Sequence, residues 1–112
     1  GSQIDWAGHD NLTDDIFAEM KDFNTAINEA LNFFLKNKNT LVLVTADHET
    51  GGMAITGGNV ARDSIKLSYT TKGHSGEMVG VFAMGTGEEL FRGVYDNFMI
   101  GRKLFKLLGK DF

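Results

Sequence analysis

The chain has 112 residues, of which 42% are hydrophobic and 23% are charged, and its formal net charge is −4 at pH 7. This length fits one domain, and the composition excludes a collagen, a coiled coil and a disordered chain. The acidic balance offers no general attraction for nucleic acid or for an anionic membrane, so we expect neither as a partner. Because the chain contains no cysteine, any transition metal must be held by nitrogen and oxygen ligands.

A long amphipathic helix is predicted from Leu12 to about Asn37. Apolar residues in this segment recur at steps of three and four, which places them on one helical face. The polar pair Asn24-Thr25 is the point at which we expect this helix to break, if it breaks. The apolar positions are Ile16, Met20, Phe23, Ile27, Ala30, Leu31 and Phe34.

Several strands are predicted to follow the long helix. Leu41 to Val44 form a continuous apolar run, which indicates a strand covered on both faces, and a long helix leading into such a strand favours the α/β class. Met53 to Thr56 lie between two glycine pairs and predict a short strand, and the alternation from Ile65 to Tyr69 predicts another. Val79 to Met84 predict a second buried strand.

The C-terminal region returns to helical spacing. The apolar residues from Glu88 to Leu108 predict two helices with a break near Asp96-Asn97. The basic, amphipathic end, "GRKLFKLLGK", has two interpretations: a terminal helix packed on the core, or a helix for a membrane or a partner. We favour packing on the core, because helical spacing already explains its apolar residues.

Asp47 and His48 stand directly after the buried strand "LVLVT". Ligands of open α/β sheets bind outside the carboxyl ends of the strands, so this is where a site is expected. A capping aspartate next to a surface histidine explains the pair equally well. Glu49 follows, but neighbouring side chains on an extended backbone point to opposite sides, so we expect Glu49 to be a bystander or a supporting group.

Two further segments carry potential metal ligands. In "DWAGH", Asp5 and His9 are four residues apart, which places them on one face if the segment is helical and clusters them in a loop if it is not. His74 lies in "KGHSGE", a glycine-flanked loop before the next buried strand. Each residue alone is explained as a turn or loop residue. Together, histidines near aspartates at element ends are typical of zinc ligands, so we expect a site for one or two divalent ions.

The segments "GSQIDWAGHD", "LVLVTADHETGG" and "HSGEMVGVFAMG" occur in the same order and with similar wording in the alkaline phosphatases, and the resemblance covers nearly the whole chain. It implies an α/β/α sandwich with a mixed, mainly parallel sheet. It also implies that Asp5, His9 and His74 bind one catalytic zinc, and that Asp47 and His48 are two ligands of a second. Two zinc ions and one magnesium ion are the cofactors that the family uses.

The resemblance implies hydrolysis of phosphate monoesters through a serine nucleophile, in a periplasmic or extracellular homo-oligomer. The nucleophile, the magnesium ligands and part of the second zinc site belong to segments upstream of those matched here. We therefore expect residues 1–112 to be the C-terminal portion of a single domain, inactive without its N-terminal part. A related metallohydrolase of phosphodiesters or sulfates and an inactive metal-binding fragment are the alternatives.

Overall fold

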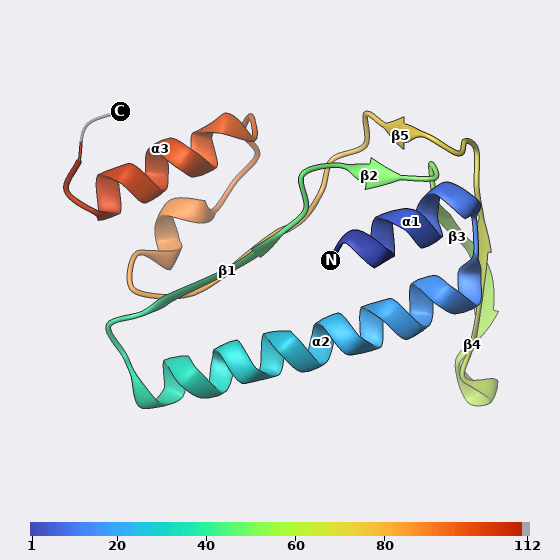
Figure 1. The fold of residues 1–112 in the computed structure, drawn as a ribbon, viewed down its shortest axis with the longest axis horizontal. Helices are drawn as coiled ribbons and strands as arrows, with labels where there is room; N and C mark the ends of the chain where they lie inside the picture. The colour runs from blue at the N-terminus through green and yellow to red at the C-terminus, as the bar shows by residue number, and fades with distance from the viewer. Residues whose placement is uncertain (111–112) are drawn as a thin grey trace. The chain divides into compact units, whose positions relative to one another are not determined.

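The computed structural model describes residues 1–110, in which two helices are followed by a series of strands and a C-terminal helix (Figure 1). The chain divides into two compact units. The first unit comprises Gly1–Ala26 and His48–Val79, and the second comprises Ile27–Asp47 and the chain from Gly80 onward. In chain order the elements are α1 (Ser2–Asp10), α2 (Thr13–Lys36), β1 (Leu41–Thr45), β2 (Glu49–Thr50), β3 (Ala54–Asn59), the 3₁₀ helix η1 (Val60–Arg62), β4 (Ser64–Ser68), β5 (His74–Ser75), β6 (Val81–Gly85), the 3₁₀ helix η2 (Glu88–Phe91) and α3 (Phe98–Leu107).

The sequence left open whether the "DWAGH" segment is helical and whether the long helix breaks, and the two N-terminal helices answer both points. The "DWAGH" segment is helical, and α1 ends at Asn11, whose left-handed backbone (φ 57°) stops the helix. The predicted long helix is confirmed as α2, but the break at Asn24-Thr25 is not. The Thr25 hydroxyl donates to the carbonyl of Lys21 at 3.2 Å, so this threonine is accommodated within the helix.

Two short antiparallel ladders organise the strands of the first unit. β2 pairs with β5, and β3 pairs with β4. The strand predicted at 53–56 continues to Asn59, because an irregular register between Ile55 and Gly57 lets the glycine pair enter the ladder. At Gly58 a side chain would collide with the backbone of Ser64 on the facing strand, so only glycine fits there.

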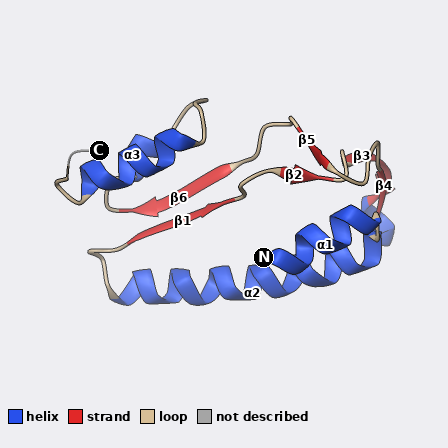
Figure 2. Ribbon diagram, turned by 45° about the horizontal axis from the view of Figure 1, so that its top comes forward, coloured by secondary structure: helices blue, strands red, loops and turns tan. Residues whose placement is uncertain are grey.

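The second unit contains a ladder of β1 and β6, which lie side by side in Figure 2. The pairing runs antiparallel, from Leu41 opposite Gly85 to Thr45 opposite Val81. Helices and strands in one chain agree with the predicted α/β class, but all three ladders within residues 1–110 are antiparallel. The predicted mainly parallel sheet is therefore not seen in this part of the chain. The 35 residues between β1 and β6 can approach from either direction, so the apolar runs alone did not determine how the strands pair.

The C-terminal helical region is interrupted where the sequence predicted. The first of the two expected helices is only the single 3₁₀ turn η2, and α3 begins at Phe98. The backbone N–H of Gly85 donates to a carboxylate oxygen of Glu88 at 2.8 Å, which fixes the turn between β6 and η2. Leu107 of α3 packs against Gly87 in that turn. The terminal helix thus packs on its own unit, as we favoured.

Few hydrophobic side chains are buried among the described residues. Ala7 and Ile16 are buried in the first unit and Phe91 in the second. β6 alternates half-buried and exposed positions, with Phe82 70% and Met84 44% exposed. One face of the β1–β6 ladder is therefore apolar and open. None of the helices within residues 1–110 combines the length and the apolar character needed to cross a membrane.

Candidate metal centre

One face of α1 carries the first two predicted ligands. Asp5 and His9 are one helical turn apart, and a carboxylate oxygen of Asp5 lies 3.5 Å from Nε2 of His9. Gly8 lies on the same face, and a Cβ there would lie 3.0 Å from Cβ of Thr50 and 3.2 Å from its carbonyl oxygen. The absence of a side chain at Gly8 therefore lets α1 come into close contact with β2, which brings Asp5 to the ladder of β2 and β5.

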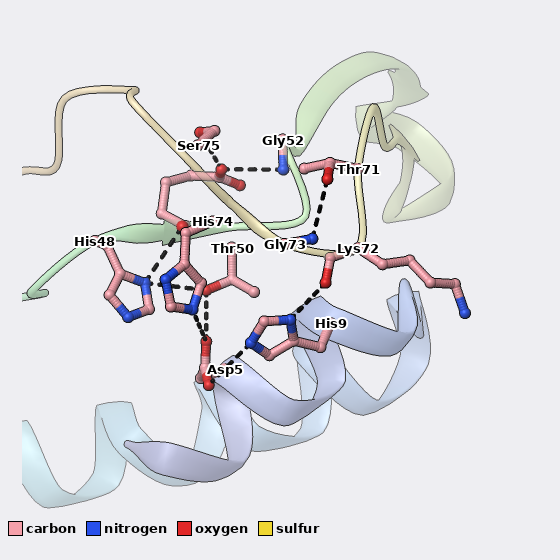
Figure 3. Close-up of polar contacts among 11 residues, drawn as sticks. Asp5, His9, His48, Thr50, Gly52, Thr71, Lys72, Gly73, His74 and Ser75 are labelled. Carbon is pink, nitrogen blue, oxygen red and sulfur yellow. Dashed lines mark hydrogen bonds and ion pairs between the residues drawn. The ribbon is translucent and has the colours of Figure 1, made fainter.

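The β2–β5 ladder brings the other two histidines to Asp5, as Figure 3 shows. Thr50 is paired with His74 across the ladder, and Nε2 of His74 lies 3.7 Å from a carboxylate oxygen of Asp5. The rings of His48 and His74 stack with their centroids 3.5 Å apart. Asp5, His48 and His74 each present a potential ligand atom, and these three atoms all lie within 4.8 Å of one another.

Hydrogen bonds to backbone carbonyls indicate which ring nitrogen carries the proton in two of the histidines. Nδ1 of His9 lies 2.5 Å from the carbonyl oxygen of Lys72, and Nδ1 of His48 lies 3.3 Å from that of Glu49. A carbonyl oxygen only accepts hydrogen bonds, so the proton belongs on Nδ1 in both rings. Nε2 then keeps its lone pair, which is the form in which a histidine binds a metal.

The carboxylate of Asp5 is held ionised by its surroundings. The Thr50 hydroxyl donates to one carboxylate oxygen at 2.6 Å, and this hydrogen bond is the main reason that the pKa of Asp5 is lowered. Desolvation opposes the effect, and the nearby imidazoles of His9, His48 and His74 add to it. Asp5 and His48 are half-buried and His74 is exposed, so solvent reaches the cluster.

Glu49 has a structural role that the sequence did not reveal. Its carboxylate accepts the backbone N–H groups of Gly52 at 3.0 Å and Met53 at 2.8 Å, and the hydroxyl of Ser75. Burial opposes ionisation, but the Met53, Ser75 and Gly52 hydrogen bonds together with His48 lower the pKa of Glu49. Glu49 therefore links the glycine turn that follows β2 with the neighbouring strand β5. The signal available in the sequence was the position of Glu49, three residues before Gly52 and four before Met53, from which an acidic side chain can accept the backbone N–H groups of a turn.

The structure brings together four of the five predicted ligands. Asp5, His9, His48 and His74 belong to the first unit, whereas Asp47 is exposed in the bend after β1 and belongs to the second. His48, which the resemblance assigned to the second zinc with Asp47, clusters with Asp5 and His74. The ligand role of all five residues, and their division between two ions, stay predictions.

The site combines imidazole nitrogens of assigned tautomer with an ionised carboxylate. This set of donors suits zinc, so the fold presents a candidate zinc site. A family model described as alkaline phosphatase matches residues 1–69, more than half of the chain. The chain belongs to the alkaline phosphatase family.

Known proteins similar to this chain are also alkaline phosphatases. Alkaline phosphatase 3 of Bacillus subtilis (strain 168) is 31% identical, over 96% of this chain and 38% of its own length. The structure of a TAB5 alkaline phosphatase mutant with Mg bound in the M3 site is 41% identical, with a TM-score of 0.88 over 99% of this chain and 35% of that one. Alkaline phosphatase from the Antarctic bacterium TAB5 is 44% identical, with a TM-score of 0.84 over 96% and 33%. The chain thus spans 38% of the curated relative's length.

Proposed function

We propose that the protein containing this chain is a zinc-dependent alkaline phosphatase that hydrolyses phosphate monoesters. The observation that carries the proposal is the convergence of Asp5, His48 and His74 within 4.8 Å, with His9 beside Asp5, in a member of the alkaline phosphatase family. This chain contributes zinc ligands, and the serine nucleophile lies in a segment outside it. The 112 residues alone are therefore expected to be inactive.

Five residues would hold the two zinc ions in this proposal. Asp5, His9 and His74 bind one zinc, which agrees with the three protein ligands usual for a catalytic zinc. Asp47 and His48 bind the second, together with ligands outside this chain. A magnesium ion, also held from outside the chain, completes the centre. Magnesium bound to a structurally similar TAB5 alkaline phosphatase supports this last ion.

The residues of the chain fit the binding of a phosphate ester. When bound, zinc supplies a Lewis acid that polarises a phosphoryl oxygen. Histidine binds a metal as a neutral imidazole and each aspartate contributes one negative charge, so the ligands of this chain would leave about half of the charge of two divalent ions uncompensated. That excess attracts a phosphate dianion. The exposure of His74 leaves a path by which the ester reaches the centre.

We further propose that residues 1–112 form the C-terminal portion of a single domain, an α/β/α sandwich with a mixed, mainly parallel sheet. The exposed Phe82 and Met84 on β6 support this, because other parts of the same protein would cover that apolar face. A homo-oligomer and a periplasmic or extracellular location follow from the family resemblance and belong to the same proposal.

The test is an activity and metal assay on the complete protein. We expect two equivalents of zinc and cleavage of phosphate monoesters, with both reduced in His9→Ala, His74→Ala and Asp47→Ala. Phosphodiester and sulfate ester substrates, assayed in parallel, distinguish a related metallohydrolase from a phosphatase. Normal monoester turnover in all three variants would contradict the proposal.

A further inference from the structure

Thr50 connects two predicted ligands through a single hydroxyl group. Its Oγ1 lies 2.6 Å from Oδ1 of Asp5 and 3.2 Å from Nδ1 of His48 (Figure 3). A hydroxyl has one proton, and an ionised carboxylate can only accept, so Thr50 donates to Asp5. The Nδ1 proton of His48 is then shared between the Thr50 hydroxyl oxygen at 3.2 Å and the Glu49 carbonyl at 3.3 Å. The result is a directed chain of hydrogen bonds from His48 through Thr50 to Asp5.

The backbone of β2 fixes the place of this hydroxyl. Thr50 is paired with His74 in the β2–β5 ladder, and the next residue, Gly51, donates its N–H to the carbonyl of Gly73 at 2.9 Å. Gly51 also accepts the N–H groups of Thr70 and Thr71, each at 3.1 Å. The hydroxyl is thus attached to a backbone that is held by the ladder at Thr50 and by three hydrogen bonds at Gly51.

The methyl group of Thr50 has a separate contact. A Cβ at Gly8 would lie 3.1 Å from Cγ2 of Thr50, so the methyl lies directly against the glycine of α1. Packing on α1 and hydrogen bonding to Asp5 are therefore carried by different atoms of the same side chain. Valine keeps the methyl contact and removes the hydroxyl, whereas serine does the reverse.

We propose that Thr50 is a positioning residue of the metal centre: its hydroxyl orients the Asp5 carboxylate and the His48 ring for metal binding. This inference rests on the proposed metal centre. The Asp5 oxygen that faces His74 is the one that Thr50 holds, so the hydroxyl limits rotation of the carboxylate between the histidines. Partners of this kind pre-organise metal ligands and raise affinity without touching the metal.

The experiment measures Zn²⁺ affinity by competition with a chromophoric chelator, in the 112-residue chain and three variants. We expect Thr50→Val to weaken binding about 10- to 100-fold and Thr50→Ser to stay within about threefold of the unchanged chain. Thr56→Val is the matched control, because the Thr56 hydroxyl bonds to Lys66 and Ser68 on β4, away from the cluster. It should bind zinc like the unchanged chain. Thermal unfolding of each metal-free variant is recorded beside the affinity.

A role in packing alone predicts the opposite order. It makes Thr50→Ser the weaker binder and the less stable metal-free chain, and leaves Thr50→Val close to normal. That order, or equal affinity in all variants, overturns the inference and leaves the proposed metal centre standing. If the unchanged chain binds no zinc, the metal centre fails and the inference fails with it. Should Thr50→Val not fold, Thr50→Ser must bind at least about tenfold more tightly than Thr50→Ala; equal binding by these two overturns the inference.

Discussion

The metal centre in the first unit and the β1–β6 ladder in the second unit are held together in different ways. In the second unit, β1 and β6 share a regular ladder of five residue pairs, and an amphipathic helix, α3, packs on the turn that follows. In the first unit, the site is built on a ladder of two pairs between β2 and β5, completed by side-chain hydrogen bonds from Thr50 and Glu49. Backbone regularity builds the second unit, and polar side chains build the site.

The difference has a functional meaning. A ladder of two pairs cannot fix the positions of His48 and His74 by itself, because so short a strand pair has little stability of its own. The carboxylate of Glu49 and the hydroxyl of Thr50 supply the missing constraints. Substitutions in the first unit should therefore affect metal binding first, and substitutions in the second unit should affect folding first.

The largest effect on metal binding is expected from Asp5→Ala. This change removes the carboxylate that faces all three histidines, and we expect Zn²⁺ affinity to fall more than about 100-fold, since loss of a ligand exceeds loss of a supporting group. Chelator competition measures it. Asp22→Ala, at an exposed position of α2, is the matched control and should bind zinc normally. Equal affinity in both variants would remove Asp5 from the metal centre.

The largest effect on folding is expected from Gly85→Ala in the second unit. Gly85 has φ +116°, and a Cβ there would collide with the carbonyl oxygen of Thr40. We expect a loss of about 3 kcal/mol in the free energy of unfolding, measured by chemical denaturation. Gly101→Ala is the control, because its Cβ would meet no atom within 4 Å inside α3, and it should stabilise the chain by about 0.5–1 kcal/mol. Similar stability in the two variants would contradict the requirement for glycine at position 85, at the end of β6.

A smaller effect is expected from Glu49→Gln in the first unit. An amide has one acceptor oxygen, and its NH₂ group faces donors, so we expect a loss of about 1 kcal/mol at neutral pH. Because the folded pKa of Glu49 is lowered, its stabilisation is complete above the ordinary glutamate pKa and is lost as the pH falls through the folded value. Denaturation at several pH values should show the two chains converging in acid. A constant difference, or an equal loss in the exposed control Glu29→Gln, would rule out this role.

The last and smallest effect is expected on self-association, from polar substitution of the open face of β6. Phe82→Ser with Met84→Thr should reduce self-association of the 112-residue chain, because this apolar face is exposed. Light scattering against concentration measures the association. Val60→Thr is the control, since Val60 is fully exposed and belongs to η1 of the first unit rather than to β6. An unchanged chain that stays monomeric at high concentration would contradict the prediction.

Sequence periodicity recovered the elements that are long enough to show it. The recurrence of apolar residues located α2 within a residue at each end, and the run from Leu41 located β1. The order of the three motifs brought Asp5, His9, Asp47, His48 and His74 into one hypothesis. Each of these predictions depended on a pattern of several residues along the chain.

What the sequence did not reveal depends on contacts between distant residues. Two-residue strands have no periodicity, so β2 and β5 could not be recognised, and His74 was expected in a loop. The antiparallel pairing of β1 with β6 joins residues 36 to 44 positions apart. The hydrogen bond from Thr50 to Asp5 joins residues 45 positions apart. Glu49 was expected to be a bystander or a supporting group, but its hydrogen bonds to the turn could be found only from the structure.

The most direct test of the central claim is a crystal structure of the zinc-loaded protein with anomalous scattering measured at the zinc edge. The account predicts a peak about 2.0–2.2 Å from a carboxylate oxygen of Asp5 and from Nε2 of His9 and His74. A zinc ion bound elsewhere, with Asp5, His9 and His74 all outside its coordination sphere, would contradict it.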